Sequence, residues 1–338
     1  MRIKLLIAAA DGDYAEHLSN TLSEKYSDAF VVSVCSTAEL LADMLAYQKF
    51  DAALLEASLI EGVDLRLIQL PLLLWTESAH VSGAADECTK VRKYQRISSI
   101  ACDILESCAK TSFSGRDPIS QRARITAVWS PAGGVGKTSV ALAFAAQKKT
   151  DGKQVLYLNL ESFSSTPVYF DKSGKSISAV FDMLDNDEGN LKMLIRAIRR
   201  QDSVSGIEYF CHAENFDDMN ILSVDDAESL IRACCTITDE LVVDLSCVCN
   251  KRTWQVLELA DRILIVADQT RTSQIKLSQF TAQHSVFQRV RAKAALIANK
   301  GAAISEPLVD AVISLPLVQS ADESLVYKTL ANSLIEVD

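Results

Sequence analysis

The stretch Pro131-Ala132-Gly133-Gly134-Val135-Gly136-Lys137-Thr138-Ser139 is the most informative part of the sequence for the fold of the larger part of this chain. It follows an apolar run at 125–130 and precedes a helical run at 138–148. A glycine-rich loop between a strand and a helix lets successive backbone N–H groups point at phosphate oxygens. The letters GKTS in this setting therefore predict a phosphate-binding loop.

The residues of the loop have predicted roles in binding a nucleoside triphosphate, most simply ATP with Mg²⁺. Lys137 is expected to reach the β- and γ-phosphates, Thr138 to ligate Mg²⁺, and Ser139 to lie beside the α-phosphate. The backbone supplies the remaining contacts, through Gly133, Gly134, Val135 and Gly136.

Apolar runs alternate with helical segments after the loop, which predicts an α/β domain with a parallel sheet over residues 124–338. Its predicted strands lie at 125–130, 155–159, 208–212, 241–245, 263–267, 294–298 and 312–315. The basic cluster Arg196, Arg199 and Arg200 is interpreted as a solvated helix face.

The same alternation at residues 1–112 predicts a second α/β domain. Its predicted strands lie at 3–9, 30–34, 51–55 and 72–75, with helices at 14–26, 37–47 and 97–109. Residues 113–123 are mostly polar, contain Gly115 and Pro118, and are predicted to form a linker. The expected fold class is α/β with two doubly wound domains.

Composition and charge limit the classes of function and the location to expect. The chain of 338 residues has a net charge of −10, which disfavours direct binding to DNA phosphates. No secretory signal opens it and no apolar run approaches the roughly 20 residues of a membrane span, so we expect a cytoplasmic protein without a transmembrane segment. Its nine cysteines lack zinc-site spacing and are expected to be buried free thiols.

The loop departs from the pattern G-x-x-x-x-G-K-[ST], because Pro131 takes the place of the first glycine. It resembles the deviant form K-G-G-x-G-K-T of the MinD/ParA family of ATPases. In that family the first lysine reaches into the nucleotide site of a partner subunit, and here Ala132 replaces it. The resemblance implies a homodimer, and the replacement predicts slow or absent ATP hydrolysis.

Four more positions resemble landmarks of that family. The segment Asn159-Leu160-Glu161 resembles the family's Asp-x-Asp, with Asn159 in place of the first carboxylate. The resemblance implies that Glu161 would hold a magnesium-bound or attacking water. Asp244 follows an apolar strand as the Walker B acid does, and would hold Mg²⁺ through water. The resemblance places adenine beside Asn299, with the turn at Pro316 closing over the base. Each residue also has a structural reading as a strand-end polar or turn residue.

Residues 1–112 resemble the receiver domain of response regulators. Glu56 stands at the phospho-acceptor position, while Thr76 and Lys93 match the receiver's hydroxyl residue and lysine. Ala8 and Ala9 replace the acidic pair that would hold Mg²⁺. The resemblance implies a degenerate receiver that serves as a docking or dimerisation surface, or one in which Glu56 imitates a permanently charged state.

A degenerate receiver joined to a MinD/ParA-like domain resembles the TadZ/CpaE family of Tad (Flp) pilus assembly proteins. The resemblance implies an ATP-binding localisation factor that works as a nucleotide-dependent dimer or docking switch. Its implied partners are a pilus secretion ATPase and other assembly proteins. The implied location is a cell pole, or the inner membrane reached through partners.

Three other classes remain open from the sequence. A ParA-type partitioning ATPase would need a basic surface for plasmid DNA, which the net charge disfavours. A MinD- or FlhG-type regulator of division or flagella would need a basic amphipathic C-terminal helix, but Lys328 is the only cation in 325–338. A ligase or reductase of the same fold would need a group of cysteines or acids specific to its substrate, for which Cys247 and Cys249 are the candidates.

Overall fold

The chain consists of two compact units in the computed structural model. The structure describes residues 2–27, 29–60, 63–76, 88–110, 123–171, 174–181, 183–184, 188–302, 309 and 311–334. The first unit comprises 1–119 with 187–197, and the second comprises 120–186 with 198–338. The predicted linker 113–123 lies, apart from its last residue, outside the described residues.

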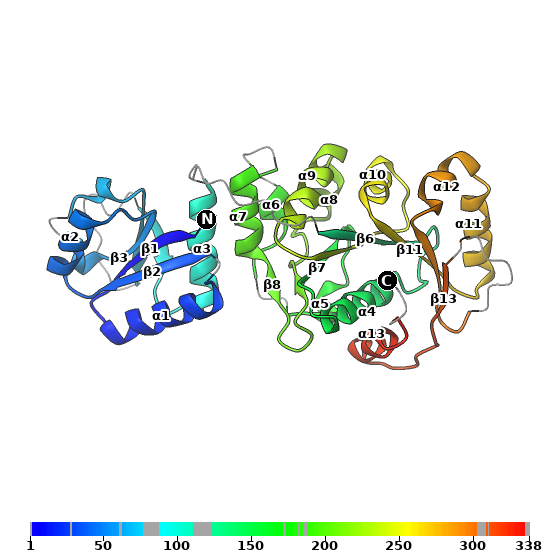
Figure 1. The fold of residues 1–338 in the computed structure, drawn as a ribbon, viewed down its shortest axis with the longest axis horizontal. Coiled ribbons are helices and arrows are strands. Elements are labelled where there is room, and N and C mark those ends of the chain that lie inside the picture. Colours follow the sequence, from blue (N-terminus) through cyan, green and yellow to red (C-terminus); the bar gives the residue numbers. More distant parts are fainter. Residues whose placement is uncertain are drawn as a thin grey trace. The chain divides into compact units, whose positions relative to one another are not determined.

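The first unit is built on a parallel sheet whose strands lie in the order β2-β1-β3-β4-β5 (Figure 1). This is the flavodoxin-like strand order, in which polar groups gather at the carboxyl ends of the strands. The elements up to residue 110 are β1 (Ile3–Ala8), α1 (Gly12–Lys25), β2 (Phe30–Cys35), α2 (Ala38–Tyr47), β3 (Ala52–Glu56), η1 (Ala57–Leu59), η2 (Leu65–Leu67), β4 (Leu70–Trp75), β5 (Thr89–Arg92) and α3 (Ile97–Lys110).

Alternating side chains of the first sheet form its core. Leu6, Ala8 and Leu55 pack with Leu41 and Leu45 of α2 in one buried cluster. Asp11 and Thr37 begin α1 and α2, because their side-chain oxygens accept from Tyr14 N and Leu40 N. Each cap satisfies an N–H group that the first helical turn would leave without a partner.

The second unit is built on a larger sheet with the order β13-β12-β11-β6-β10-β7-β9-β8. Every pair is parallel except β8–β9. The elements from residue 124 onward are β6 (Arg124–Trp129), α4 (Lys137–Thr150), β7 (Val155–Asn159), α5 (Thr166–Tyr169), α6 (Ser178–Phe181), α7 (Glu188–Ile198), β8 (Arg200–Gln201), β9 (Glu208–Tyr209), α8 (Phe216–Ile221), α9 (Val224–Cys235), β10 (Glu240–Asp244), α10 (Lys251–Leu259), β11 (Arg262–Ala267), α11 (Arg271–Thr281), α12 (His284–Arg291), β12 (Ala294–Ala298), β13 (Ala311–Ser314) and α13 (Glu323–Ala331).

Strand β6 occupies the centre of this sheet, between β10 and β11. The chain leaves β6 through α4 and returns as β7 beyond β10, so the strand order reverses around β6. Crevices at such reversals, outside the carboxyl ends of the strands, are where open α/β sheets bind ligands. The loop at 130–136 starts at this point.

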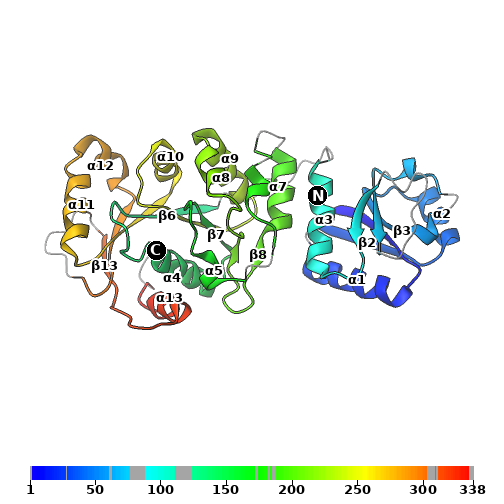
Figure 2. The same ribbon diagram turned by 180° about the vertical axis from the view of Figure 1, so that it is seen from behind.

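Helix α4 is buried on nearly every side. The residues from Val140 to Ala145 are all at 0% exposure. One cluster joins α4 to the sheet and to Tyr327 and Leu330 of α13. In Figures 1 and 2, α4, α5 and α13 lie on one face of the sheet, and α8, α9 and α10 lie on the other. A helix that is apolar all round is expected in such a layered position.

The α/β prediction with parallel sheets is confirmed, but the interpretation of the arginine cluster is wrong. Helix α7 ends at Ile198, and Arg200 begins strand β8. Arg199 Nη1 donates to Glu208 Oε2 at 3.1 Å, and both side chains are largely buried. The short antiparallel pairing of β8 with β9 therefore replaces the expected helix face.

Two further expectations are corrected. Cys247 and Cys249 are exposed, because they lie in the loop after β10 rather than in an apolar run. Strand β5 lies at 89–92, where the sequence predicted none. Only Val91 of that strand is buried, so the apolar signal is a single residue.

Candidate nucleotide site

The loop after β6 has the backbone that its glycines require. Gly134 and Gly136 have φ values of 74° and 91°, in the left-handed region that residues with a side chain rarely adopt. Ala132 and Val135 are buried in the core cluster, whereas Gly133 and Gly134 are exposed. The loop is thus anchored by its two apolar side chains and presents its glycines outward, directly before the first turn of α4.

Gly136 is the loop glycine to which a neighbouring side chain comes closest. A Cβ at this position would lie 2.5 Å from Asn299 Nδ2, whereas a Cβ on Gly134 would meet nothing within 4 Å. Both substitutions force a left-handed backbone onto alanine, which costs about 1–2 kcal/mol.

We therefore expect Gly136→Ala to lower the free energy of unfolding of the second unit more than Gly134→Ala does. The clash displaces Asn299, while the backbone strain is common to both variants. Thermal unfolding of the two variants side by side measures the difference. Equal losses would show that the Asn299 contact contributes nothing.

Asp244 lies at the end of β10, level with Val128 of β6 and Asn159 of β7. Its side chain is fully buried, and its Oδ2 accepts from Tyr157 Oη at 2.8 Å and from Asn159 Nδ2 at 3.2 Å. Its Oδ1 is buried without a hydrogen-bond partner among the described residues. A buried carboxylate oxygen without a partner is costly, so its position calls for a ligand.

The charge state of Asp244 reflects this setting. Burial and, to a smaller extent, the Glu161 carboxylate raise the pKa of Asp244 to about 7, against the opposing effect of the Thr138 and Tyr157 hydroxyls and of Lys137. Thr138, Lys137 and Glu161 therefore surround the Asp244 carboxyl group. With Asp244, they are four of the residues that the sequence predicted for one site.

Glu161 lies just beyond β7, partly buried. Burial raises the pKa of its carboxyl group, while Lys137 and Asn159 lower it. Asn159 Oδ1 accepts from Glu161 N at 3.0 Å. Asn159 therefore holds Glu161 and Asp244 together through its two amide ends.

These residues fit a nucleotide with Mg²⁺. Gly133 and Gly134 are exposed, so their backbone is open to a ligand. Lys137 supplies a cation at the start of α4 and is only 8% exposed. The Asp244 Oδ1 atom without a partner and the nearby Thr138 hydroxyl are the hard oxygen donors that Mg²⁺ prefers. Ser139 lies on the first turn of α4, and its hydroxyl partly offsets the rise that burial causes in the pKa of Tyr169.

The base-side residues predicted from the sequence also meet at this edge. Asn299 directly follows β12, and its Nδ2 donates to Val135 O at 2.8 Å. Gly301 N donates to Leu315 O at 2.8 Å, which brings the segment of Pro316 beside the Asn299 loop. Pro316 itself is exposed.

In the first unit, the predicted phospho-acceptor position is filled by an ion pair. Glu56 Oε1 lies 3.2 Å from Lys93 Nζ, and Glu56 Oε2 accepts from Ala10 N at 2.9 Å. The Lys93 side chain is 4% exposed and its Nζ lies 5.1 Å from the ring centroids of both Tyr14 and Tyr94. Both oxygens of Glu56 are thus already engaged.

We expect intact mass to stay unchanged when the protein is treated with a small phosphodonor such as acetyl phosphate. Lys93 and Ala10 hold the Glu56 carboxylate, and Ala8 and Ala9 offer no carboxylate for Mg²⁺. Addition of one phosphoryl group that disappears in Glu56→Gln would contradict this expectation.

The second unit thus belongs, by its sheet and its glycine loop, to the α/β proteins with a phosphate-binding loop. No protein-family model matches the sequence. No curated protein matches it. Among solved structures, a ParA family ATPase from Chlorobium tepidum TLS aligns with a TM-score of 0.53 and 17% identity, over 64% of this chain and 98% of that chain. The cell division ATPase MinD from Pyrococcus furiosus aligns with a TM-score of 0.48 and 12% identity, over 64% of this chain and 100% of that chain.

The first of these alignments shows the fold of the matched part. It covers more residues than the first unit contains, so it must extend into the second unit. The predicted ParA-like fold is therefore confirmed there. The receiver, the pilus role and the individual site residues stay predictions.

Three residues of the site were absent from the sequence predictions. Tyr157 is fully buried in β7 and bonded to Asp244, and Asp268 and Lys300 contact each other beside the loop. A tyrosine within a buried strand does carry a signal, since its hydroxyl needs a partner. Nothing in the sequence points to the pairing of Asp268 with Lys300.

Proposed function

We propose that the second unit binds ATP with Mg²⁺ and uses it as a switch for dimerisation or docking. The observation that carries this proposal is the buried Asp244, whose Oδ1 has no hydrogen-bond partner among the described residues, beside Lys137 and the left-handed glycines of the loop. Lys137 would bind the β- and γ-phosphates, and Thr138 and Asp244 would hold the metal. The chemistry that Mg²⁺ would supply there is neutralisation of phosphate charge.

Each residue around the metal position has its own part in the switch. Tyr157 and Asn159 donate to Asp244 Oδ2, so Oδ1 is the oxygen that would hold the metal. Asn159 also holds the backbone of Glu161, the group that would position a water. A nucleotide that orders Glu161 would thereby order the loop after β7, as γ-phosphate contacts order switch segments.

Slow or absent hydrolysis is part of the proposal. Ala132 is buried, with its N–H donating to Ser130 Oγ at 3.1 Å, and offers no cation. Asn159 is neutral where the resembling segment carries a carboxylate. The site keeps the groups that bind and lacks two that would speed turnover, so binding rather than turnover would be the output.

For the whole chain we propose the role of a TadZ/CpaE-like localisation factor in a Tad-type pilus machine. The support is the pairing of this unit with a unit of flavodoxin-like strand order whose acceptor position holds the Glu56–Lys93 ion pair. The first unit would then be a docking surface. Its partners would be the secretion ATPase and assembly proteins, at a pole or at the inner membrane.

Positioning of another cargo, as by MinD-, FlhG- or ParA-like ATPases, is the second candidate. The alignment with a ParA family ATPase favours this broader reading. Two observations favour docking on protein over membrane or DNA. The apolar residues Tyr327 and Leu330 of α13 are buried against the core, and the net charge is −10. Among the described residues, no helix is long and apolar enough to cross a membrane.

Sedimentation velocity with Mg-ATP, Mg-ADP or no nucleotide tests the switch, combined with measurement of phosphate release. We expect Mg-ATP alone to form a dimer, and phosphate release to lag far behind dimer formation. A mass that is independent of nucleotide would overturn the switch. In the organism that encodes the chain, loss of surface pili on deletion separates the pilus role from other cargo.

A further inference from the structure

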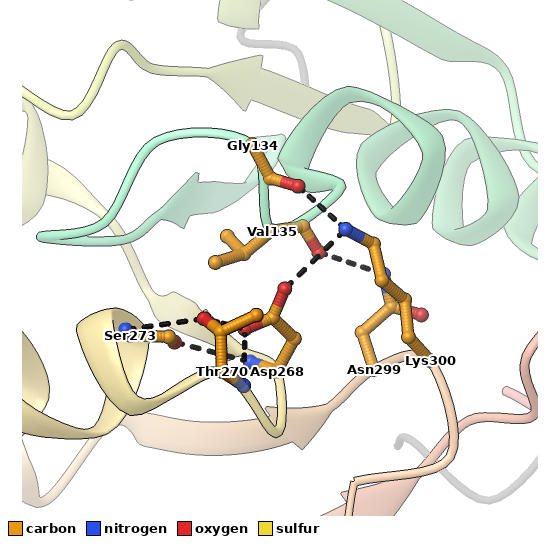
Figure 3. Close-up of polar contacts among 7 residues, drawn as sticks. All are labelled: Gly134, Val135, Asp268, Thr270, Ser273, Asn299 and Lys300. Atoms are coloured by element: carbon orange, nitrogen blue, oxygen red, sulfur yellow. Dashed lines mark hydrogen bonds and ion pairs between the residues drawn. The ribbon is translucent and has the colours of Figure 1, made fainter.

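Lys300 reaches the phosphate loop from a different strand. It follows Asn299 at the end of β12 and has a φ of 60°, which turns it back toward the loop. Its Nζ donates to Gly134 O at 2.6 Å and lies 3.3 Å from Asp268 Oδ2 (Figure 3). One lysine thus joins a loop carbonyl to a carboxylate that follows β11.

Asp268 is a fixed anchor for this lysine. Its side chain is 5% exposed. Its Oδ1 accepts from Thr270 Oγ1 at 2.6 Å and from Thr270 N at 3.1 Å, and its own N–H donates to Ser273 Oγ at 3.1 Å. These bonds tie Asp268 to the start of α11. Its other oxygen, Oδ2, is left to Lys300.

Two consecutive loop carbonyls are therefore held from outside. Lys300 donates to the Gly134 carbonyl and Asn299 donates to the Val135 carbonyl (Figure 3). In a phosphate-binding loop the N–H groups face the anion, so the carbonyls between them face away. Fixing these carbonyls fixes the direction of the N–H groups.

We propose that Lys300, anchored by Asp268, is a positioning residue that holds the phosphate loop in its binding conformation before any nucleotide arrives. The benefit of this order for ATP binding rests on the proposed function, but the order of the empty loop can be measured without a ligand. Preorganisation improves affinity by removing an ordering cost at the moment of binding. The Lys300 bond is charge-assisted although its side chain is 39% exposed, and the Asn299 bond beside it is buried.

The decisive measurement is an NMR spectrum of nucleotide-free protein labelled with ¹⁵N only at glycine. The chain has 12 glycines, so Gly134 and Gly136 can be assigned by single substitutions. We expect Lys300→Met to broaden or split these two signals and leave glycines outside the loop in place. Asp268→Asn should act in the same direction more weakly, and Lys300→Arg should restore part of the order.

Binding of a fluorescent ATP analogue then measures the consequence. We expect Lys300→Met to raise Kd about tenfold, which corresponds to about 1.4 kcal/mol, with a slower association rate. Lys276→Met, on the exposed side of α11, is the matched control and should change nothing. Lys137→Met should abolish binding while the empty loop stays ordered, which separates failure of the site from failure of this proposal.

Unchanged Gly134 and Gly136 signals in Lys300→Met would overturn the proposal. Loss of order across all the glycines would overturn it as well, because Lys300 would then stabilise the fold as a whole. If the native protein binds no nucleotide, the proposed function is wrong, while the glycine signals still decide the role of Lys300.

Discussion

Replacing Lys137 with alanine is expected to abolish measurable ATP binding. Lys137 is buried at the start of α4, directly after the glycines of the loop. Truncating one partner of a buried charge pair costs about 2–5 kcal/mol, a rise in Kd of about 30- to 4,000-fold. Isothermal titration with Mg-ATP measures this loss directly.

The control for Lys137→Ala is Lys276→Ala, which removes an exposed lysine of α11. It leaves the loop untouched and should bind as the native protein does. Circular dichroism establishes that both variants are folded. Native-like affinity in a folded Lys137→Ala protein would mean that the loop is a structural turn.

Replacing Asp244 with asparagine is expected to have two effects of opposite sign. With nucleotide, the dependence of affinity on Mg²⁺ should disappear, because the amide is a poor magnesium ligand. Without nucleotide, the variant should be more stable than the native protein at pH 8. Burial raises the pKa of Asp244 from its ordinary 3.8 to about 7, so the native state holds a proton that the unfolded chain releases.

The pH dependence follows from that shift. Between pH 4 and 7 the native carboxyl group stays protonated, and its stability contribution is lost as pH rises to 7. Above pH 7 the native protein carries the full cost of a buried charge, which asparagine avoids. Each 1 kcal/mol raises Tm by about 2–4 °C in a unit of this size.

Melting curves of both proteins at pH 4 and pH 8 check this expectation. The gap in Tm should be present at pH 8 and close toward pH 4. Asp225→Asn, an exposed change near the start of α9, is the control and should show no gap. A variant less stable than the native protein at pH 8 would show that the charge of Asp244 is satisfied without a metal.

Much of the fold could be predicted because each strand carries its own apolar signal. The runs ending at Trp129 and Asp244 are buried along nearly their whole length, as parallel strands covered on both faces require. Strand β5 could not be found this way. It lies at the edge of its sheet, and Val91 is its one buried residue.

The site divides in the same manner. The phosphate loop is contiguous in the chain, so its glycines and Lys137 are legible as letters. Tyr157 and Lys300 act on residues that are 87 and 166 positions away. Their contacts depend on strand register and on the turn after β12, which no local pattern encodes.

The bond from Lys300 to the phosphate loop is made within one chain. A loop that its own chain keeps in shape can load nucleotide without a second copy. Loading and assembly are then separate steps, and the monomer should bind ATP at protein concentrations too low for a dimer to form. A substitution on the surface that meets a partner would then leave the nucleotide site of the monomer intact.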